Sequence, residues 1–363
     1  MSIVKFGDIV KDVKNNVDRT NNPYEFYVAG DHMDSEDLNI RRRGRFATDD
    51  VGPAFVRIFE PGQILYGSRR TYLKKVAVAD FSGICANTTF VLESKDPKVF
   101  DQRLLPFLML SNAFTEWSIS KSKGSTNPYV LFSDLAGFEF DLPSLDEQKV
   151  LADKLWAAYE VKQSYLKMIE ATQEMVKSQF IEMFKEVSHK VTLENVVNIK
   201  DDCRKPINDS VRSTMKSGEL YPYYGATGVV DYVNDYITNE QLLCIAEDCG
   251  NYRAGEESSY IIDGKAWVNN HAHVVKPKDT CSIEYLHQYL KIQNLMPYVS
   301  GTTRLKLTQK KLKEIPVILP DKERQMEFVA ITKQADKSEF ELRKSIDAID
   351  KVVKSLINYI SHK

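Results

Sequence analysis

Two short loops combine a glycine with hydroxyl and cationic side chains, a combination that suits phosphate binding. In the first loop Lys123 precedes Gly124-Ser125-Thr126, and in the second Gly301-Thr302-Thr303 precedes Arg304 and Lys306. Glycine lets the backbone approach a phosphate closely, while hydroxyl and cationic groups donate hydrogen bonds to its oxygens. The pattern favours contact with a nucleic-acid backbone. The alternative is that each loop only leads the chain into a strand.

Other polar side chains match the edges of DNA bases. Arginine pairs with guanine and asparagine with adenine in the major groove. Arg253 and the run Asn269-Asn270-His271 supply such groups, and Tyr224 lies in an aromatic turn. The alternative for the two asparagines is a turn. The candidate DNA-binding residues are Arg69, Arg70, Lys74, Lys123, Ser125, Thr126, Tyr224, Arg253, Asn269, Asn270, His271, Thr303, Arg304 and Lys306.

Signatures of catalysis and metal binding are weak. Asn127-Pro128-Tyr129 lacks the second proline of the Asn-Pro-Pro-Tyr motif of amino-methyltransferases, so a turn is the better interpretation. Cys244 and Cys249 lack a second Cys or His pair at zinc spacing, and we expect buried thiols. His271 and His273 alone do not make a metal site. We therefore predict no catalytic residue and no metal ligand on this chain.

The charge balance limits the kind of DNA binding. The 363 residues include 49 basic and 51 acidic side chains, whereas an indiscriminate nucleic-acid binder is usually strongly basic. DNA contact must then come from local patches or with help from a partner. The basic knot Arg41-Arg42-Arg43 with Arg45 is one such patch, with a solvated surface as the alternative.

Composition places the protein among globular chains. Hydrophobic residues make up 43% and charged residues 28%. Five scattered cysteines indicate reduced thiols rather than a disulfide framework. The N-terminus lacks the pattern of a signal peptide, and no apolar run is long enough to cross a membrane. We expect a cytoplasmic protein without a membrane partner.

The sequence repeats itself. Gly124-Ser125-Thr126 returns as Gly301-Thr302-Thr303, 177 residues later. The same shift aligns Leu142 with Leu319, Gln148 with Gln325, Asn127 with Arg304, and Tyr129 with Lys306. Apolar positions match while loop side chains differ. Two like domains with different polar tips would suit the recognition of two different short sequences.

Long helices are the clearest elements that could position these loops. Ser144 and Glu147 have the spacing of a capping box, and apolar residues then recur every three or four positions for some forty residues, a rod of roughly 60 Å. A second copy starts near Asp321. Neither apolar stripe can be buried alone, which favours an antiparallel coiled coil. The predicted pairing residues are Leu151, Leu155, Ile169, Val176, Phe180, Phe328, Ile331, Ile346, Val353 and Leu356.

The remaining sequence predicts mixed domains of the α+β class. Strands are predicted at 62–66, 75–79, 88–92, 242–246 and 273–275, and short helices near 104–111 and 283–292. We predict one mixed α/β domain at 1–143, a spacer helix at 144–187, a second mixed α/β domain at 188–320 and a C-terminal spacer helix at 321–363. The repeat predicts a pseudo-twofold arrangement.

The duplicated pattern of a Gly-Ser/Thr-Thr loop, an apolar strand, Leu-Pro and a helix start with glutamine resembles the specificity subunit of type I restriction–modification enzymes. Segments 27–32, 221–228 and 266–274 also resemble the recognition domains of that family. The chain departs from the family in its short length. It also has Ser144-Leu145 or Asp321-Lys322 after Leu-Pro, where a second proline is frequent.

The resemblance implies a non-catalytic subunit in a larger enzyme. Each mixed domain would be a target-recognition domain that reads one half of a split, asymmetric site in double-stranded DNA. The paired helices would set the distance between the halves. They would also dock modification (methyltransferase) subunits, two being the expected number, and a restriction (motor-nuclease) subunit would translocate and cut. S-adenosylmethionine, ATP and Mg would be bound by those partners, with no cofactor on this chain.

Three alternatives stay open at this point. The same subunit could serve a stand-alone methylase or a fused nuclease-methylase. A coiled-coil adaptor with two protein-binding domains would have no DNA role. A free-standing DNA methyltransferase is the weakest alternative, because no glycine-rich loop follows an early strand.

Overall fold

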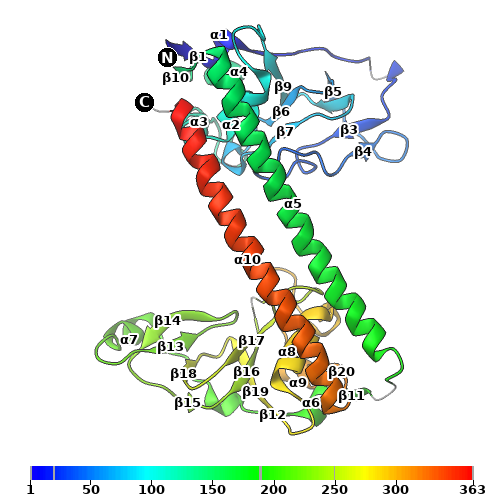
Figure 1. Cartoon of the computed structure of the whole chain (residues 1–363), viewed down its shortest axis with the longest axis vertical. Coiled ribbons are helices and arrows are strands. Elements are labelled where there is room, and N and C mark those ends of the chain that lie inside the picture. Colours follow the sequence, from blue (N-terminus) through cyan, green and yellow to red (C-terminus); the bar gives the residue numbers. More distant parts are fainter. Residues whose placement is uncertain (1, 19–20, 188–189, 249, 362–363) are drawn as a thin grey trace. The chain divides into compact units, whose positions relative to one another are not determined.

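The computed structural model describes residues 2–18, 21–187, 190–248 and 250–361 (Figure 1). The chain divides into two compact units. The first comprises residues 1–165 and 344–363, and the second comprises residues 166–343. Each unit therefore contains the start of one long helix and the end of the other. The four domain boundaries drawn from the sequence stay predictions.

The described residues of the first unit form three small sheets. Strands β1 (Ser2–Lys5) and β10 (Glu139–Leu142) pair antiparallel. The second sheet has the order β2 (Val10–Asp12), β9 (Thr89–Ser94), β6 (Ile64–Gly67), β7 (Val76–Val78), and the third has the order β4 (Gly44–Arg45), β3 (Phe26–Val28), β8 (Gly83–Ala86), β5 (Phe55–Phe59). The β3–β8 pair is parallel. Helices in this unit are α1 (Phe6–Ile9), α2 (Leu105–Leu110), α3 (Asn112–Ser120) and α4 (Phe132–Leu135), with 3-10 turns at Thr71–Leu73 and Gln102–Leu104.

The second unit repeats this topology. Strands β11 (Lys190–Thr192) and β20 (Pro316–Ile318) pair antiparallel. The other two sheets have the orders β12 (Val197–Ile199), β19 (Ala272–Pro277), β16 (Leu242–Ala246), β17 (Ser259–Ile262) and β14 (Val229–Val233), β13 (Tyr221–Tyr224), β18 (Lys265–Val268), β15 (Thr238–Asn239). The β13–β18 pair is again parallel. Helices are α6 (Leu193–Val196), α7 (Asp209–Thr214), α8 (Ile283–Ile292) and α9 (Gln309–Lys313), with 3-10 turns at Asp201–Cys203 and Met296–Tyr298. The prediction of two like α+β domains is confirmed.

The two long helices are α5 (Leu145–Phe184) and α10 (Lys322–Ser361). The predicted capping box is present, because the Ser144 backbone N–H donates to the Glu147 carboxylate over 2.9 Å. No described helix is both long and apolar enough to cross a membrane.

Parts of both long helices pack together within each unit. In the first unit Leu151, Leu155 and Ile357 are buried in one core, with Val353 and Leu356 partly buried against it. The Lys162 Nζ lies 2.6 Å from Asp350 Oδ1, while Leu151, earlier on α5, lines a pocket with Leu356, later on α10. The segments of this unit therefore run antiparallel.

The second unit shows the same pairing. Phe180 and Phe328 pack edge to face with ring centroids 5.3 Å apart, and farther back on α5 Gln173 Nε2 lies 3.3 Å from the Glu339 carboxylate. Val176 is buried in this core and Ile331 is half-buried. Of the remaining predicted pairing residues, Ile169 and Ile346 are buried in the second and first units respectively. The predicted antiparallel direction is confirmed within each unit, and the pseudo-twofold arrangement stays a prediction.

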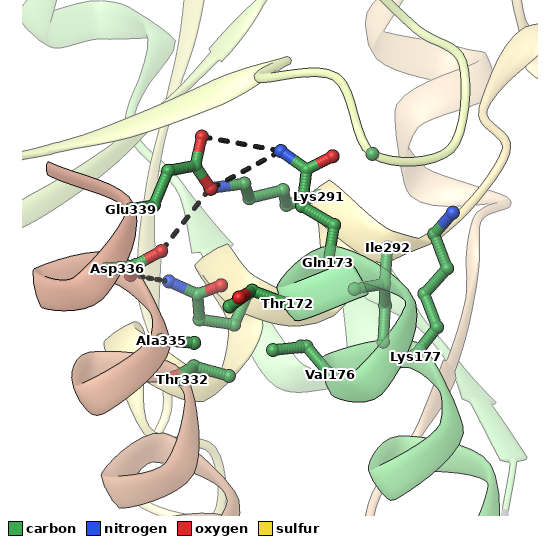
Figure 2. Close-up of a pocket in the computed structure, with 12 residues that line it drawn as sticks. Thr172, Gln173, Val176, Lys177, Lys291, Ile292, Thr332, Ala335, Asp336 and Glu339 are labelled. Atoms are coloured by element: carbon green, nitrogen blue, oxygen red, sulfur yellow. Dashed lines mark hydrogen bonds and ion pairs between the residues drawn. The ribbon is translucent and has the colours of Figure 1, made fainter. Parts of the chain in front are cut away.

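A small pocket lies where α5, α8 and α10 meet in the second unit (Figure 2). Its volume is about 30 Å³, which is room for little more than one water molecule. Polar contacts cross it: Gln288 Nε2 donates to Asp336 over 2.9 Å, and Gln173 reaches Glu339. The Gln288–Asp336 bond ties the mixed domain to α10, and the Gln173–Glu339 contact joins the two long helices.

One buried glutamine anchors the start of each long helix. The Gln148 Oε1 accepts from the Asp101 N–H over 2.9 Å, and its Nε2 donates to the carbonyls of Val99 and Pro143. Gln325 makes the equivalent three bonds to Ser282, Thr280 and Pro320. Both side chains are fully buried. The aligned glutamines therefore fix the direction in which each helix leaves its unit.

We predict that Gln325→Leu lowers the free energy of unfolding by about 2–4 kcal/mol, because three buried backbone groups lose their partner. Chemical denaturation followed by circular dichroism measures this. The matched control is Gln334→Leu on the exposed face of the same helix, which should change stability by less than about 0.5 kcal/mol. Equal stability of the two variants would contradict the anchoring role.

Candidate nucleic-acid interface

In the first unit, the glycine loop is held against the segment that follows β6. Lys123 and Tyr129 exchange backbone hydrogen bonds of 2.8 and 2.9 Å, which closes the loop, and the Val130 N–H donates to the Ser68 carbonyl over 2.9 Å. Arg69 forms a β-bridge with Tyr129. Gly124, at the turn of the loop, has a φ of 87°, which favours glycine. The structure thus brings together cations that the sequence separates by more than fifty positions.

The predicted residues of this surface differ in exposure. Arg69, Arg70, Ser125 and Thr126 are exposed, as is Lys123, whose Nζ lies 2.9 Å from Asp134. Lys74 is mostly covered, since its side chain is 19% exposed and pairs with Glu36 over 2.9 Å. Lys74 therefore has a structural partner, and it offers less cation surface than the arginines.

Two non-glycine residues in this surface have left-handed backbone conformations. Arg70 has φ 50° and Lys74 has φ 47°, at the two ends of the 3-10 turn Thr71–Leu73. Such conformations cost of order 1 kcal/mol or more each and persist only where neighbours enforce them. The Arg70 N–H donates to the Pro128 carbonyl over 2.7 Å, so the glycine loop is one of those neighbours.

The second unit builds the same backbone arrangement. Ser300 and Lys306 exchange hydrogen bonds of 2.9 and 2.8 Å, and the Leu307 N–H donates to the Glu247 carbonyl over 2.7 Å. Gly301 has φ 95°, and a Cβ there would lie 2.3 Å from the Arg304 carbonyl oxygen, so only glycine fits. The β-bridges Lys123–Tyr129 and Ser300–Lys306 are themselves 177 residues apart, as in the sequence repeat.

The side chains on these matched backbones differ in charge. Ser68-Arg69 of the first unit corresponds to Glu247-Asp248 of the second, because each segment forms the same bridge to its glycine loop. In the second unit Arg304 Nη2 lies 2.6 Å from Asp248 Oδ2, and Lys306 Nζ lies 3.1 Å from Glu247 Oε1. The predicted cations of the second loop are thus paired with acids, whereas the first unit has a cation at the Asp248 position.

The run from Asn269 to His271 joins this surface. His271 Nδ1 lies 2.8 Å from Asp248 Oδ1. Asn269 is only 7% exposed, and its Oδ1 accepts from the His271 N–H over 2.8 Å. The structure therefore gives Asn269 the turn-forming role that was the alternative, while Asn270 is exposed and His271 is partly exposed.

Beneath the loop lies an ion-pair network that the sequence did not indicate. Asp201 Oδ2 lies 2.9 Å from His273 Nδ1 and 3.1 Å from Arg204 Nη2, and Arg204 also pairs with Glu247. Burial raises the pKa of Asp201, but hydrogen bonds from His273, Gln309 and the Val274 N–H outweigh it and hold that pKa below its usual range. The positions of Asp201 and Glu247 along the chain give no sign of this network, because its members come from four separate segments of the sequence.

The histidines are held by separate acids, since His271 contacts Asp248 and His273 contacts Asp201. Across the described ranges, no group of three or more His, Cys, Asp or Glu side chains could hold a metal ion. Cys85, Cys244 and Cys281 are buried, and burial raises the pKa of the Cys244 thiol to about 12. Cys249 lies outside the described residues.

Three candidates remain, namely Tyr224, Arg253 and Thr303. Tyr224 is half-buried and stacks on Tyr260 with ring centroids 5.4 Å apart. Arg253 is exposed farther along the segment that begins at Glu247, and Thr303 is exposed in the glycine loop. The arginine knot of the first unit is neutralised locally, since Arg41, Arg42 and Arg45 pair with Asp37, Asp34 and Glu25, and Arg43 stacks on Phe26.

Comparison with known proteins identifies the repeated unit. A sequence model of the type I restriction modification DNA specificity domain matches residues 5–170 and again residues 185–350. A putative type I restriction enzyme specificity subunit of Haemophilus influenzae, S.HindORF215P, is 40% identical over 139 residues, which are 38% of this chain and 35% of that protein. The EcoDI specificity subunit of Escherichia coli is 29% identical over 148 residues, 41% of this chain and 32% of that protein. These alignments span about a third of each relative.

Solved structures share the fold. The S subunit of a type I restriction–modification system from M. genitalium aligns over 98% of this chain and 94% of its own, with a TM-score of 0.60 and 16% identity. A chain from a structural study of complex assembly and conformational transition of the type I R-M system aligns over 98% of this chain and 96% of its own, with a TM-score of 0.54 and 19% identity. At such identities the likeness concerns the fold.

We predict that Asp201→Asn destabilises the protein at neutral pH by about 1–3 kcal/mol and that the loss shrinks in acid. A carboxylate whose pKa is lower in the folded state stabilises that state above its unfolded pKa, near 4. The contribution disappears as the pH falls through the folded pKa. Denaturation at pH 7 and pH 3 measures this. Asp202→Asn, at the exposed neighbouring residue, is the control. An equal loss of unfolding free energy in Asp201→Asn at pH 7 and pH 3 would contradict the ionic role of Asp201.

Proposed function

The chain belongs to the family of type I restriction modification DNA specificity domains and carries two of them, and we propose that it is the DNA specificity subunit of a type I restriction–modification system. In this proposal each unit reads one half of a bipartite, asymmetric site in double-stranded DNA. The chain performs no bond chemistry. Its contribution is the free-energy difference between binding the right sequence and binding a wrong one.

The observation that carries the proposal is the pair of matched glycine loops with unmatched side chains. Equivalent backbone bridges hold both loops, so the two units present side chains from equivalent positions. Arg69, Asn127 and Tyr129 in the first unit correspond to Asp248, Arg304 and Lys306 in the second. One fold with two different sets of donors and acceptors supports recognition of two different half-sites.

The long helices support a second part of the proposal. Two 40-residue helices, each anchored to a unit by a buried glutamine, are suited to set the spacing between the half-sites. We propose that they also dock two modification (methyltransferase) subunits, and that a restriction subunit joins the complex. S-adenosylmethionine, ATP and Mg would then act on those partners. We also propose that the complex works in the cytoplasm.

Charge explains why we expect tight DNA binding only in the complex. The chain has a formal net charge of −2, and the Arg304 and Lys306 cations of the second loop already have acidic partners. Phosphate contacts supply a large share of the affinity of a DNA-binding protein and make it salt-dependent. Weak binding by the isolated chain and tighter binding by the assembled complex follow from this balance.

We predict that Arg304→Ala lowers the affinity of the assembled complex for its cognate DNA about 5- to 100-fold, which corresponds to about 1–3 kcal/mol. Fluorescence anisotropy across a salt titration measures this. The matched control is Arg343→Ala on α10. Both arginines are 60% exposed and both lie 2.6 Å from a carboxylate, but Arg343 is on the spacer helix. Unchanged binding by Arg304→Ala at every salt concentration would count against the assignment of this loop. If the wild-type complex binds no DNA at all, the adaptor alternative is favoured.

We also predict that inserting four residues after Tyr165 in α5, with four more after Arg343 in α10, widens the gap between the half-sites by about two base pairs. Four helical residues add roughly 6 Å, and one base pair spans about 3.4 Å. Sequencing of the bases methylated by the assembled complex reports the gap. Replacing four residues at each place without changing the length is the control, and an unaltered gap after insertion would refute the spacing role.

A further inference from the structure

Asp248 is a largely covered acid within the candidate nucleic-acid interface. Its side chain is 13% exposed, and its two oxygens contact two different side chains of the candidate interface. Oδ1 lies 2.8 Å from His271 Nδ1, and Oδ2 lies 2.6 Å from Arg304 Nη2. The partners are far more exposed, at 42% for His271 and 60% for Arg304. A covered carboxylate thus contacts one ring nitrogen of His271 and one terminal nitrogen of the Arg304 guanidinium, while both partner side chains stay largely exposed.

The contact determines what each tip offers to a ligand. A carboxylate only accepts hydrogen bonds, so the His271 nitrogen that touches it carries the hydrogen. In the neutral ring the other nitrogen, Nε2, is then an acceptor, which suits the amino group of adenine or cytosine. The Arg304 guanidinium has only donors, which suits the O6 and N7 acceptors of guanine. His271 therefore suits a base edge that donates a hydrogen bond, and Arg304 suits one that accepts hydrogen bonds.

The backbone fixes the position of Asp248. It forms a β-bridge with Lys306, and the neighbouring Glu247 N–H donates to the His271 carbonyl over 2.8 Å. The matched bonds in the first unit join Arg69 to Tyr129, and Ser68 to the Thr88 carbonyl over 3.2 Å. Arg69 and Thr88 therefore stand where the second unit has Asp248 and His271. The acid belongs to the side chains that differ between the units, not to the shared scaffold.

We propose that Asp248 is a positioning residue for base recognition by the second unit. Asp248 orients Arg304 and His271 before DNA binds. The proposal rests on the proposed function, because it concerns sequence discrimination. Ordering a long side chain during binding costs free energy, and a side chain that is already held avoids that cost. Asp248 acts through its two partners and reads no base itself.

Positioning and simple electrostatics predict opposite results for Asp248→Asn. Removal of an acid near phosphates should strengthen binding to every DNA sequence. Loss of positioning should instead weaken binding to the cognate site relative to variants of that site. The loss should be confined to the base positions that Arg304 and His271 read. Asp248→Glu adds a second test, because it keeps the charge and changes only the reach of the carboxylate.

The experiment uses the full chain assembled with its modification subunits. Selection from a random pool of DNA duplexes by the wild-type complex defines the site. Dissociation constants are then measured for that site and for each single-base substitution in it. Arg304→Ala and His271→Ala identify the positions that these two residues read. Thermal unfolding shows that each variant is folded.

We expect Asp248→Asn and Asp248→Glu to lose about three- to tenfold in discrimination at those positions and to keep it elsewhere. The effect of Asp248→Asn should vanish when Arg304 and His271 are both alanine, because the acid acts through them. The matched control is Glu240→Gln, which removes an acid paired with Lys276 near the other end of β16 and should leave discrimination unchanged.

Two results overturn the proposal, and they differ. If the wild-type complex selects a bipartite site and Asp248→Asn binds all sequences equally well or better without relaxing any position, the positioning role is wrong while the proposed function stands. If the wild-type complex enriches no sequence, the proposed function fails and this inference fails with it.

Discussion

The candidate interface depends on one backbone interaction, the bridge between a glycine loop and the segment that follows a central strand. Arg69 pairs with Tyr129 in the first unit, and Asp248 pairs with Lys306 in the second. Because the bonds are between backbone atoms, they do not depend on the side chains present. The same backbone bridge can therefore carry different recognition side chains, provided that glycine occupies the turn where φ is positive.

Electrostatics then distinguishes the two units. In the first, Arg69 and Arg70 are exposed beside Lys123. In the second, the equivalent surface pairs its loop cations with Glu247 and Asp248, above a buried layer that contains Asp201 and His273. Exposed cations suit phosphate contact, whereas cations held by carboxylates are fixed in direction and suit the recognition of a particular base edge.

In the proposed function, the long helices connect local packing to the geometry of the DNA site. Within each unit an apolar seam pairs α5 with α10, and a buried glutamine fixes the helix start to the mixed domain. Two helices that pack only through apolar side chains can shift slightly against each other. At each helix start, three hydrogen bonds from one glutamine to backbone groups form together in only one position of the helix. This rigidity is what the proposed measurement of half-site spacing requires.

The amino-acid sequence by itself determined the duplication, the α+β class, the long helices with their pairing stripes and the short helices near 104–111 and 283–292. Periodicity and repetition are properties of neighbours along the chain, so they can be read without coordinates. The sequence also located both glycine loops, because glycine at a positive φ and the cations beside it are local features. Only the tertiary structure placed Arg69 against Tyr129, buried Asn269 in a turn and paired Arg304 with Asp248. Those contacts join residues that are distant in the chain, and the acids among them follow no period.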